Sequence, residues 1–352
     1  MIFIVKCLLY ISLGLFLHSY ILYPIIVGLF YFLQKKKKRI QFTIEDDLPM
    51  VFILISVHNE EKIIRQKLES LFQTNYPLDH IQVYVGSDFS NDHTNSILQE
   101  FQTKYTNLHA LFYNVRRGKP QVLNDLMKVV RENHSLADDR IVLYTDANVI
   151  LNKDTIYRMV KNFKDPKVGL VDCRMISGDL TKTGVAKSED NYIRLESRLK
   201  QWEGELWGCM MGAFGGCYAV RSNLVCTLPE KILVDDFYIS MKVLEQNYFA
   251  ISDSEALAFE SLTGSFQQEF RRKSRISSGN IQNLIFFYKN VLTRPFIENF
   301  CFFSHKVIRW IGPVLLVLSI LSSFILTMEQ KGIHSIVFIT LCVVLFLIPW
   351  MD

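Results

Sequence analysis

The chain has 352 residues, with 49% hydrophobic and 13% aromatic side chains and a formal net charge of +4. At about 150 residues per domain, this length leaves room for one or two domains beside membrane segments. The small positive charge owes much to the basic run Lys35–Arg39 and gives no reason to expect a nucleic-acid partner. Seven cysteines show no C-x-x-C spacing. This argues against a zinc site or a disulfide framework and leaves a catalytic cysteine open, without a local signal for one.

The first apolar stretch runs from Ile2 to Leu33 and ends directly before the basic run. It is longer than the apolar core of a signal peptide, about 7–15 residues, and no A-x-A-like cleavage site precedes the basic run. We therefore expect residues 1–34 to be a transmembrane anchor, because about 20 apolar residues suffice for a helix to cross a bilayer. The basic run predicts a cytoplasmic location for the following domain, with contact to anionic membrane lipid as a second role.

Residues 49–265 alternate between strand and helix patterns. Short, nearly continuous apolar runs predict buried strands at Val51–Val57, Ile81–Val85, Leu108–Tyr113 and Ile141–Tyr144. Helical spacing of apolar residues lies between them, in a helix capped by Asn59, in Thr94–Tyr105 and in Pro120–Val130. This order predicts an α/β fold with a parallel sheet and helices on both faces.

Polar side chains follow all four predicted strands. They are His58, Asn59 and Glu60, then Asp88 and Asp92, then Arg116, Arg117 and Lys119, and finally Asp146 and Asn148. The carboxyl ends of parallel strands meet at one edge of a sheet, and ligands bind there. The sequence therefore predicts one site at that edge.

Six motifs in this order resemble those of inverting family 2 glycosyltransferases of the GT-A (nucleotide-diphospho-sugar transferase) fold, specifically the membrane-bound, cellulose-synthase-like branch. The segments that carry the resemblance are Val57–Glu61, Val85–Thr94, Arg116–Asn124, Thr145–Asn148, Val234–Asp236 and Arg272–Ile276. The sequence departs from the family pattern where Ser87 replaces an Asp, Asn148 replaces the second Asp of D-x-D, and Ile276 replaces a Trp.

The resemblance implies a role for each motif. Asp236 is expected to be the catalytic base, with Asp235 in the place of the usual Glu. The expected donor-binding residues are His58, Asn59, Glu60, Asp88, Lys119, Asp146, Arg272 and Arg275. Asp146 and Asn148 are expected to hold Mg²⁺ or Mn²⁺, and Gly215, Gly216 and Trp207 to shape the acceptor side. Each role has a plainer alternative. The acids could be turn or cap residues, and the cations could lie at the surface. The large side chains within residues 208–216 could be core, and Trp207 could anchor the chain at the membrane interface.

The C-terminal part returns to the membrane. Aromatic residues interspersed with lysine and arginine predict interfacial amphipathic helices over residues 266–310. Two apolar runs within residues 311–352, Ile311–Thr327 and Ile333–Trp350, predict two antiparallel spans, with Lys306 and Arg309 as a cytoplasmic flank.

The resulting functional expectation is a multi-pass enzyme of the inner or plasma membrane, with its catalytic domain in the cytoplasm. It is expected to transfer a sugar, most simply from a UDP-linked donor, to a polysaccharide or a lipid-linked glycan. Few spans and the replacement of Trp by Ile276 favour a single addition, or polymer export through partner proteins. A non-catalytic partner that binds sugar nucleotide within a synthase complex is the alternative from another functional class.

Overall fold

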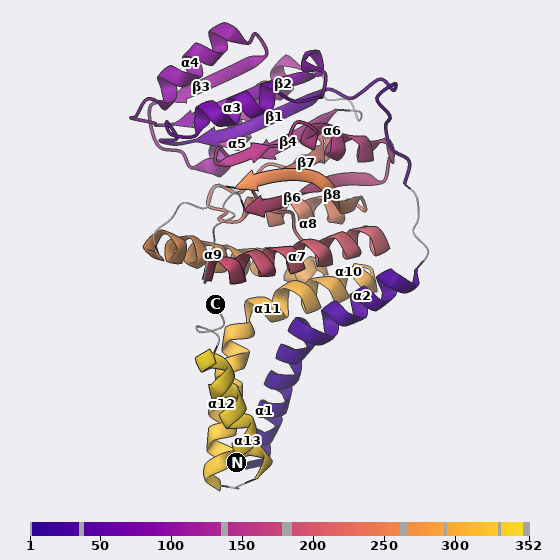
Figure 1. Cartoon of the computed structure of the whole chain (residues 1–352), viewed down its shortest axis with the longest axis vertical. Helices are drawn as coiled ribbons and strands as arrows, with labels where there is room; N and C mark the ends of the chain where they lie inside the picture. Colours follow the sequence, from indigo (N-terminus) through magenta and orange to yellow (C-terminus); the bar gives the residue numbers. More distant parts are fainter. Residues whose placement is uncertain are drawn as a thin grey trace. The chain divides into compact units, whose positions relative to one another are not determined.

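The computed structural model describes residues 2–34, 39–134, 140–177, 185–260, 266–291, 294–329 and 332–347. The chain forms two compact units. The sheet unit comprises Lys35–Leu180 and Lys200–Ile285, and the helical unit comprises Met1–Gln34, Thr181–Leu199 and Phe286–Asp352. Figure 1 labels the elements of both units. The boundary divides one long helix, α7 (Val185–Trp207), between them.

The sheet unit is built on one mixed sheet. Its strands are β1 (Val51–Val57), β2 (Ile81–Asp88), β3 (Leu108–Tyr113), β4 (Ile141–Thr145), β5 (Val149–Leu151), β6 (Val168–Ser177), β7 (Cys217–Arg221) and β8 (Phe249–Glu260). Their order across the sheet is β3-β2-β1-β4-β7-β6-β8-β5. The four predicted strands pair in parallel. The parallel pairing predicted from these four strands is confirmed, and the sheet becomes mixed beyond β4, because β7 pairs antiparallel with both β4 and β6, and β5 pairs antiparallel with β8.

Helices cover both faces of this sheet, as the alternation predicted. Apolar residues of α3 (Ile64–Phe72), α4 (Thr94–Lys104) and α6 (Thr155–Val160) share one core with every second residue of β1. On the other face, α5 (Lys119–Asn133) packs on β1 and β2. Its close approach requires Gly86, where a Cβ atom would lie 2.3 Å from Val122 Cγ1.

The expected helix cap at Asn59 is wrong, because α3 begins only at Ile64. Asn59 has a positive φ of 55°, and its side-chain oxygen accepts a hydrogen bond from the Asn91 N–H at 2.9 Å. The chain after β1 therefore forms a loop bound to the next strand-end loop before the helix starts.

The helical unit contains the apolar ends of the chain. Helices α1 (Ile2–Leu17) and α2 (Tyr23–Leu33) continue through a π-helical turn, so that Ile2–Leu33 is long and apolar enough to cross a membrane. Helix α12 (Gly312–Glu329) meets the same criterion, and α13 (Ile333–Leu347) contains a shorter apolar segment. Helices α1 and α12 pack together. Buried Ser12 and Ser319 share a 2.8 Å hydrogen bond there, a contact typical of helices associated in lipid.

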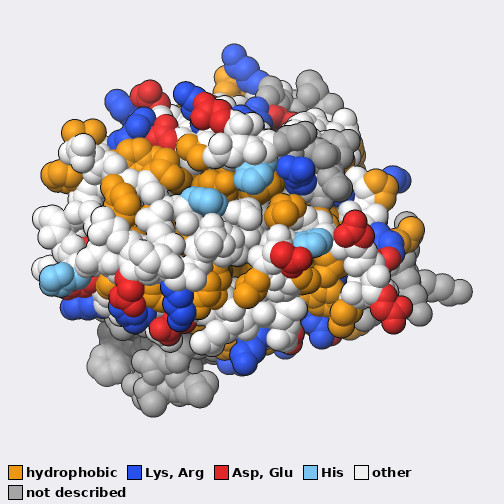
Figure 2. Space-filling model, turned by 90° about the horizontal axis from the view of Figure 1, so that it is seen from above, with side chains coloured by type: hydrophobic (Ala, Val, Ile, Leu, Met, Phe, Trp, Pro, Cys, Tyr) orange, Lys and Arg blue, Asp and Glu red, His pale blue; other side chains and the backbone are white. Residues whose placement is uncertain are grey.

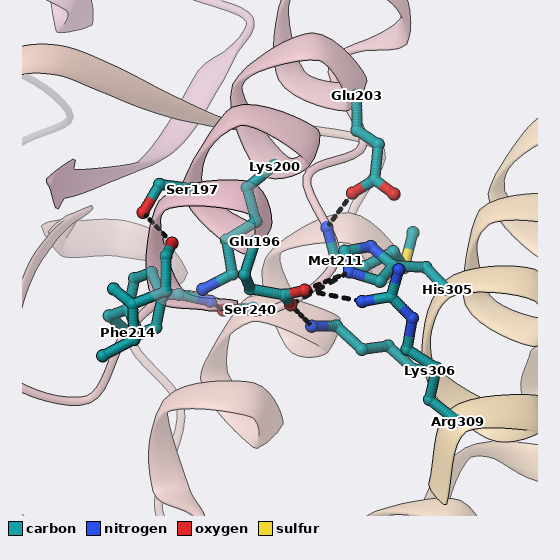
Figure 3. A network of polar contacts seen from close by, with 12 residues as sticks. Glu196, Ser197, Lys200, Glu203, Met211, Phe214, Ser240, His305, Lys306 and Arg309 are labelled. Atoms are coloured by element: carbon teal, nitrogen blue, oxygen red, sulfur yellow. Dashed lines mark hydrogen bonds and ion pairs between the residues drawn. The ribbon is translucent and has the colours of Figure 1, made fainter. Parts of the chain in front are cut away.

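A buried carboxylate ties the first part of α7 to the segment before α12. Glu196 binds His305 Nε2 at 2.9 Å and Arg309 at 2.8 Å, and it also binds Lys306 (Figure 3). Burial alone would raise the pKa of Glu196, but the basic groups outweigh it and hold the pKa well below its usual range. Such a buried cluster is stable only while every member keeps its partners.

Charged side chains on the face drawn in Figure 2 are mixed, with basic and acidic groups interspersed. The described side chains of that face therefore form no extended basic surface of the kind that binds nucleic acid. Lys35–Lys38 of the basic run lie outside the described residues. Arg39 donates a hydrogen bond to the Gly204 carbonyl at 2.7 Å.

Gly86→Ala tests the packing of α5. The added methyl group would overlap Val122 Cγ1, so we expect a loss of stability of about 1–3 kcal/mol, measured by chemical or thermal unfolding of the purified protein. Gly86→Ala combined with Val122→Ala should recover part of this loss. An undiminished stability of the single variant would contradict the close approach.

Candidate active site

The site begins with two loops that follow β1 and β2 and bind each other. Besides the Asn59–Asn91 bond, the Glu60 N–H donates to Thr94 Oγ1 at 2.9 Å, and His58 Nδ1 lies 2.8 Å from the Asp88 carbonyl oxygen. Phe89, like Asn59, has a positive φ, here 60°, a strained conformation that is enriched at functional sites. The structure thus gives His58 and Asn59 a role in joining the loops, and their contact with the donor stays a prediction.

Asp88 positions the loop that precedes α5. Its two oxygens accept hydrogen bonds from the Arg117 N–H at 2.7 Å and the Gly118 N–H at 2.9 Å, and Arg116 Nε lies 3.0 Å away. The Asp88 side chain is only 2% exposed. Its predicted contact with the donor base therefore competes with these bonds and remains untested. This geometry gives α5 a defined start, with Lys119 as its first residue.

Lys119 links two of the predicted acids. Its ammonium group lies 2.9 Å from Asp146 Oδ1 and 3.4 Å from Asp235 Oδ2. Burial would lower the pKa of Lys119, but the carboxylates of Asp146 and Asp235 outweigh it and raise the pKa. Lys119 is thus a permanent cation that joins the loop after β4 to the start of α8 (Asp235–Glu245).

Asp236 is partly buried next to the glycine-rich loop before β7. A Cβ atom on Gly215 would lie only 2.8 Å from Asp236 Oδ2, so the backbone of this loop touches the carboxylate. Burial and, second, the charge of Asp235 raise the pKa of Asp236 to about 6. A carboxylate with a pKa near the working pH is well suited to take a proton from a hydroxyl group.

The other predicted residues lie at different distances from this centre. Asn148 donates to Glu260 Oε1 at 3.3 Å. Gly216 packs on Met175 and Val149, and its carbonyl oxygen accepts the Asp146 N–H at 3.0 Å. It therefore supports the Asp146 loop. Trp207 is the last residue of α7, and its acceptor role stays a prediction.

Arg272 and Arg275 lie on α9 (Phe266–Val291), which packs against the residue before Asp235. A Cβ atom on Gly279 would lie 2.4 Å from Val234 Cγ2, and Asn283 donates to the Val234 carbonyl at 3.0 Å. Arg272 is half-buried and Arg275 is exposed. Their common helix is therefore bound to the start of α8, while their contact with a diphosphate remains a prediction.

The sequence reasoning missed several buried polar residues around the site, namely Lys67, Asp172, Lys200, Glu203 and Ser240. Lys67 donates to Thr145 Oγ1 at 2.7 Å and so supports the residue that directly precedes Asp146. Burial lowers the pKa of Lys67 to about 8. Two signals were present in the sequence, because Lys67 falls on the apolar stripe of its helix and Asp172 interrupts the apolar run of β6.

A divalent metal would find few protein ligands here. Among the described residues, no three His, Cys, Asp or Glu side chains form a cluster that could hold a metal. Lys119 occupies Asp146 Oδ1, which leaves Asp146 Oδ2 and the Asn148 side-chain carbonyl as oxygen donors. Mg²⁺ and similar ions accept such a sparse set because substrate phosphates and water complete their coordination. These residues therefore fit a cation that arrives with a diphosphate.

Asp236→Asn should stabilise the fold. An unfolded aspartate ionises near pH 3.8, whereas Asp236 ionises near pH 6 in the folded protein, so its ionised form at neutral pH costs stability. We expect the variant to melt roughly 5 °C higher at pH 8, with the gap closing as the pH falls to about 4. Asp79→Asn, at an exposed side chain, is the matched control. A gap independent of pH would contradict the raised pKa.

Comparisons with known proteins bear on this arrangement. A model of glycosyl transferase family 2 matches residues 52–219, and one of glycosyl transferase family group 2 matches residues 141–351. The probable glycosyltransferase YdaM of Bacillus subtilis is 25% identical over 284 residues, which are 76% of this chain and 65% of that protein. A beta-monoglucosyldiacylglycerol synthase of Nostoc is 26% identical over 191 residues, 53% of this chain and 37% of that protein. The chain thus covers less than two thirds of either relative.

A solved structure with a similar fold covers nearly all of the chain. The mannosyltransferase PcManGT from Pyrobaculum calidifontis, in complex with GDP-Man and Mn²⁺, has a TM-score of 0.75 and 20% identity, covering 97% of this chain and 91% of its own. At this identity the likeness concerns the fold alone. With the family models together over more than half of the chain, the conclusion is that the chain belongs to glycosyltransferase family 2 and has the GT-A fold.

Proposed function

We propose that this chain is a membrane-anchored, inverting glycosyltransferase that moves a sugar from a nucleotide-sugar donor to a lipid-linked acceptor. The observation that carries the proposal is the partly buried Asp236 carboxylate, which lies against the Gly215 backbone and beside the Lys119–Asp146–Asp235 bridge. A base with a raised pKa next to a fixed cation is what displacement of a diphosphate requires.

The proposed donor site uses positive charge on both sides of the leaving group. Lys119 extends from the start of α5, and Arg272 and Arg275 lie on α9. Arginine can bind phosphate oxygens through two parallel hydrogen bonds. These groups stabilise the negative charge that develops on the departing diphosphate. A UDP-linked sugar is the donor that the sequence motifs favour.

The proposed reaction is a single displacement. The Asp236 carboxylate takes the proton of the acceptor hydroxyl group while that oxygen forms a bond to the anomeric carbon. The bond from this carbon to the donor phosphate oxygen breaks, and the electron pair leaves with the nucleoside diphosphate. The new glycosidic bond has the opposite configuration, so an α-linked donor yields a β-linked product. Asp235 holds Lys119 in place during this step.

A bound divalent cation, held by Asp146 and Asn148 and by the donor phosphates, would add positive charge for the leaving group. The acids near Lys119 support this part of the proposal. Asp146 and Asp235 together carry more negative charge than one lysine neutralises. Lys119 thus leaves one negative charge of these two acids unbalanced, and a divalent cation would neutralise it as the diphosphate enters.

A lipid-linked acceptor is supported by the apolar segments Ile2–Leu33 and Gly312–Glu329. It is further supported by an exposed apolar stripe on α9, formed by Phe270, Ile281 and Ile285. The name of the Nostoc relative, a glycolipid synthase, is consistent with this choice. We propose a single addition in preference to polymer extension, because Ile276 stands where the processive members of the branch carry Trp.

The main test uses purified protein with a panel of nucleotide sugars and membrane lipid acceptors. Asp236→Asn should keep its donor affinity and lose transfer by about 10²–10⁴-fold, measured by calorimetry and product release, while Asp79→Asn stays active. Loss of donor binding in Asp236→Asn would count against the base role. An unmutated protein that neither binds nor turns over any donor would favour the non-catalytic alternative.

The metal proposal has a separate test. Removal of divalent ions by a chelator should abolish transfer, and Mg²⁺ or Mn²⁺ should restore it. Asp146→Asn should raise the metal concentration for half-maximal activity at least tenfold, in line with the loss of a ligating carboxylate. Full activity in the chelator would overturn this part.

A further inference from the structure

The loop of residues 209–216, here termed the acceptor loop, is held by buried side chains from three different elements. Three of its backbone N–H groups donate to side-chain oxygens: Met211 to Glu203 at 3.1 Å, Ala213 to Ser240 at 3.0 Å, and Phe214 to Asp172 at 3.0 Å. Figure 3 shows the Glu203–Met211 bond. A glycine-rich loop would otherwise sample many conformations, so these bonds fix the backbone that touches Asp236.

Lys200 and Asp172 form a buried ion pair beneath this loop. Lys200 Nζ lies 3.6 Å from Asp172 Oδ2 and 3.5 Å above the centre of the Phe214 ring. The two side chains are 3% and 1% exposed. Burying such a pair costs more than burying apolar residues of similar size. Packing alone would be served better by apolar side chains, which points to a use for the charges.

The charges that face Asp236 come from five elements. Asp235 lies on the same helix, Lys119 comes from α5, and Lys200 comes from α7. Asp172 on β6 and Tyr218 on β7 also interact with Asp236 electrostatically. Of these groups, the two lysines favour the ionised base, and Asp235 opposes it. Burial raises the pKa of Asp172 to about 7 against the opposing effect of Lys200. Asp172 is therefore largely uncharged at the more acidic pH at which Asp236 titrates.

We propose that Lys200 and Asp172 are positioning residues for the sugar transfer, which together hold the acceptor loop against Asp236, while the ammonium group of Lys200 adds to that of Lys119 in favouring the ionised base. This inference rests on the proposed base role of Asp236. In it, Asp172 fixes the Phe214 backbone and holds Lys200 beneath the loop. The pair thus sets both the place and the proton affinity of the base.

The test is the pH dependence of turnover by the full chain in detergent. The probe is UDP release from UDP-glucose, or from whichever donor of the panel is turned over, with water as the acceptor. Lys200→Met should move the acid limb of kcat/KM to higher pH by about one unit and lose little activity at pH 9. Lys200→Arg should restore the original limb. Asp172→Asn keeps an oxygen for the Phe214 N–H and should leave the limb near its original pH, because Asp172, whose pKa is raised to about 7, is largely protonated where Asp236 titrates.

A limb that moves in Lys200→Met and stays in place in Asp172→Asn would support the proposal, because a merely structural defect lowers activity at every pH. An unmoved acid limb in Lys200→Met would overturn the proposal. If Lys200→Met fails to fold, the neutral pair Asp172→Asn/Lys200→Met takes its place and should show a limb at higher pH than Asp172→Asn alone. Coincident limbs in these two variants would likewise overturn it.

The failure of this inference can be told apart from the failure of the proposed function. Transfer that survives in Asp236→Asn would remove the base role and the inference with it. Transfer lost in Asp236→Asn together with an unmoved limb in Lys200→Met would remove only the role of the ion pair.

Discussion

The structure depends on the placement of two lysine ammonium groups among four acids. Lys119 joins Asp146 to Asp235, and Lys200 lies beside Asp172 and acts on Asp236. Without these cations, such partly or fully buried carboxylates would be protonated or would repel one another. The arrangement also leaves the acids in excess. This excess supports the proposed entry of an anionic donor together with a divalent cation, which connects the electrostatics of the fold to the proposed chemistry.

The sheet unit produces this arrangement by ending several elements at one place. Asp88, at the end of β2, fixes the loop that starts α5 and thus places Lys119. Gly216 holds the Asp146 backbone, and Lys67 supports the residue before it. Helix α8 starts at Asp235, and the carbonyl group of the preceding residue, Val234, accepts a hydrogen bond from Asn283 of α9. Each charged group therefore has its own backbone support, which is how a site keeps its geometry while it carries electrostatic strain.

In the helical unit, too, buried charged and polar side chains are surrounded by partners. Glu196 is stable in a buried position because His305, Lys306 and Arg309 surround it. In the same unit, Ser12 and Ser319 share a hydrogen bond between two apolar helices. Polar groups in an apolar environment need partners. These contacts join segments that are far apart in the chain, and they give the apolar helices a specific packing.

The sequence by itself determined the family, the first four strands, the long apolar segments and the order of the site motifs. These features rest on local patterns, such as short apolar runs, helical spacing and polar residues after strands. Only the tertiary structure decided the antiparallel pairing of β7, the loop at Asn59 and the bridge from Lys119 to Asp235. It also showed the support that Lys67, Asp172 and Lys200 give to the site. These features depend on contacts between side chains from distant parts of the chain. A local sequence pattern does not distinguish a charged residue that will be buried beside a partner from one that lies at the surface.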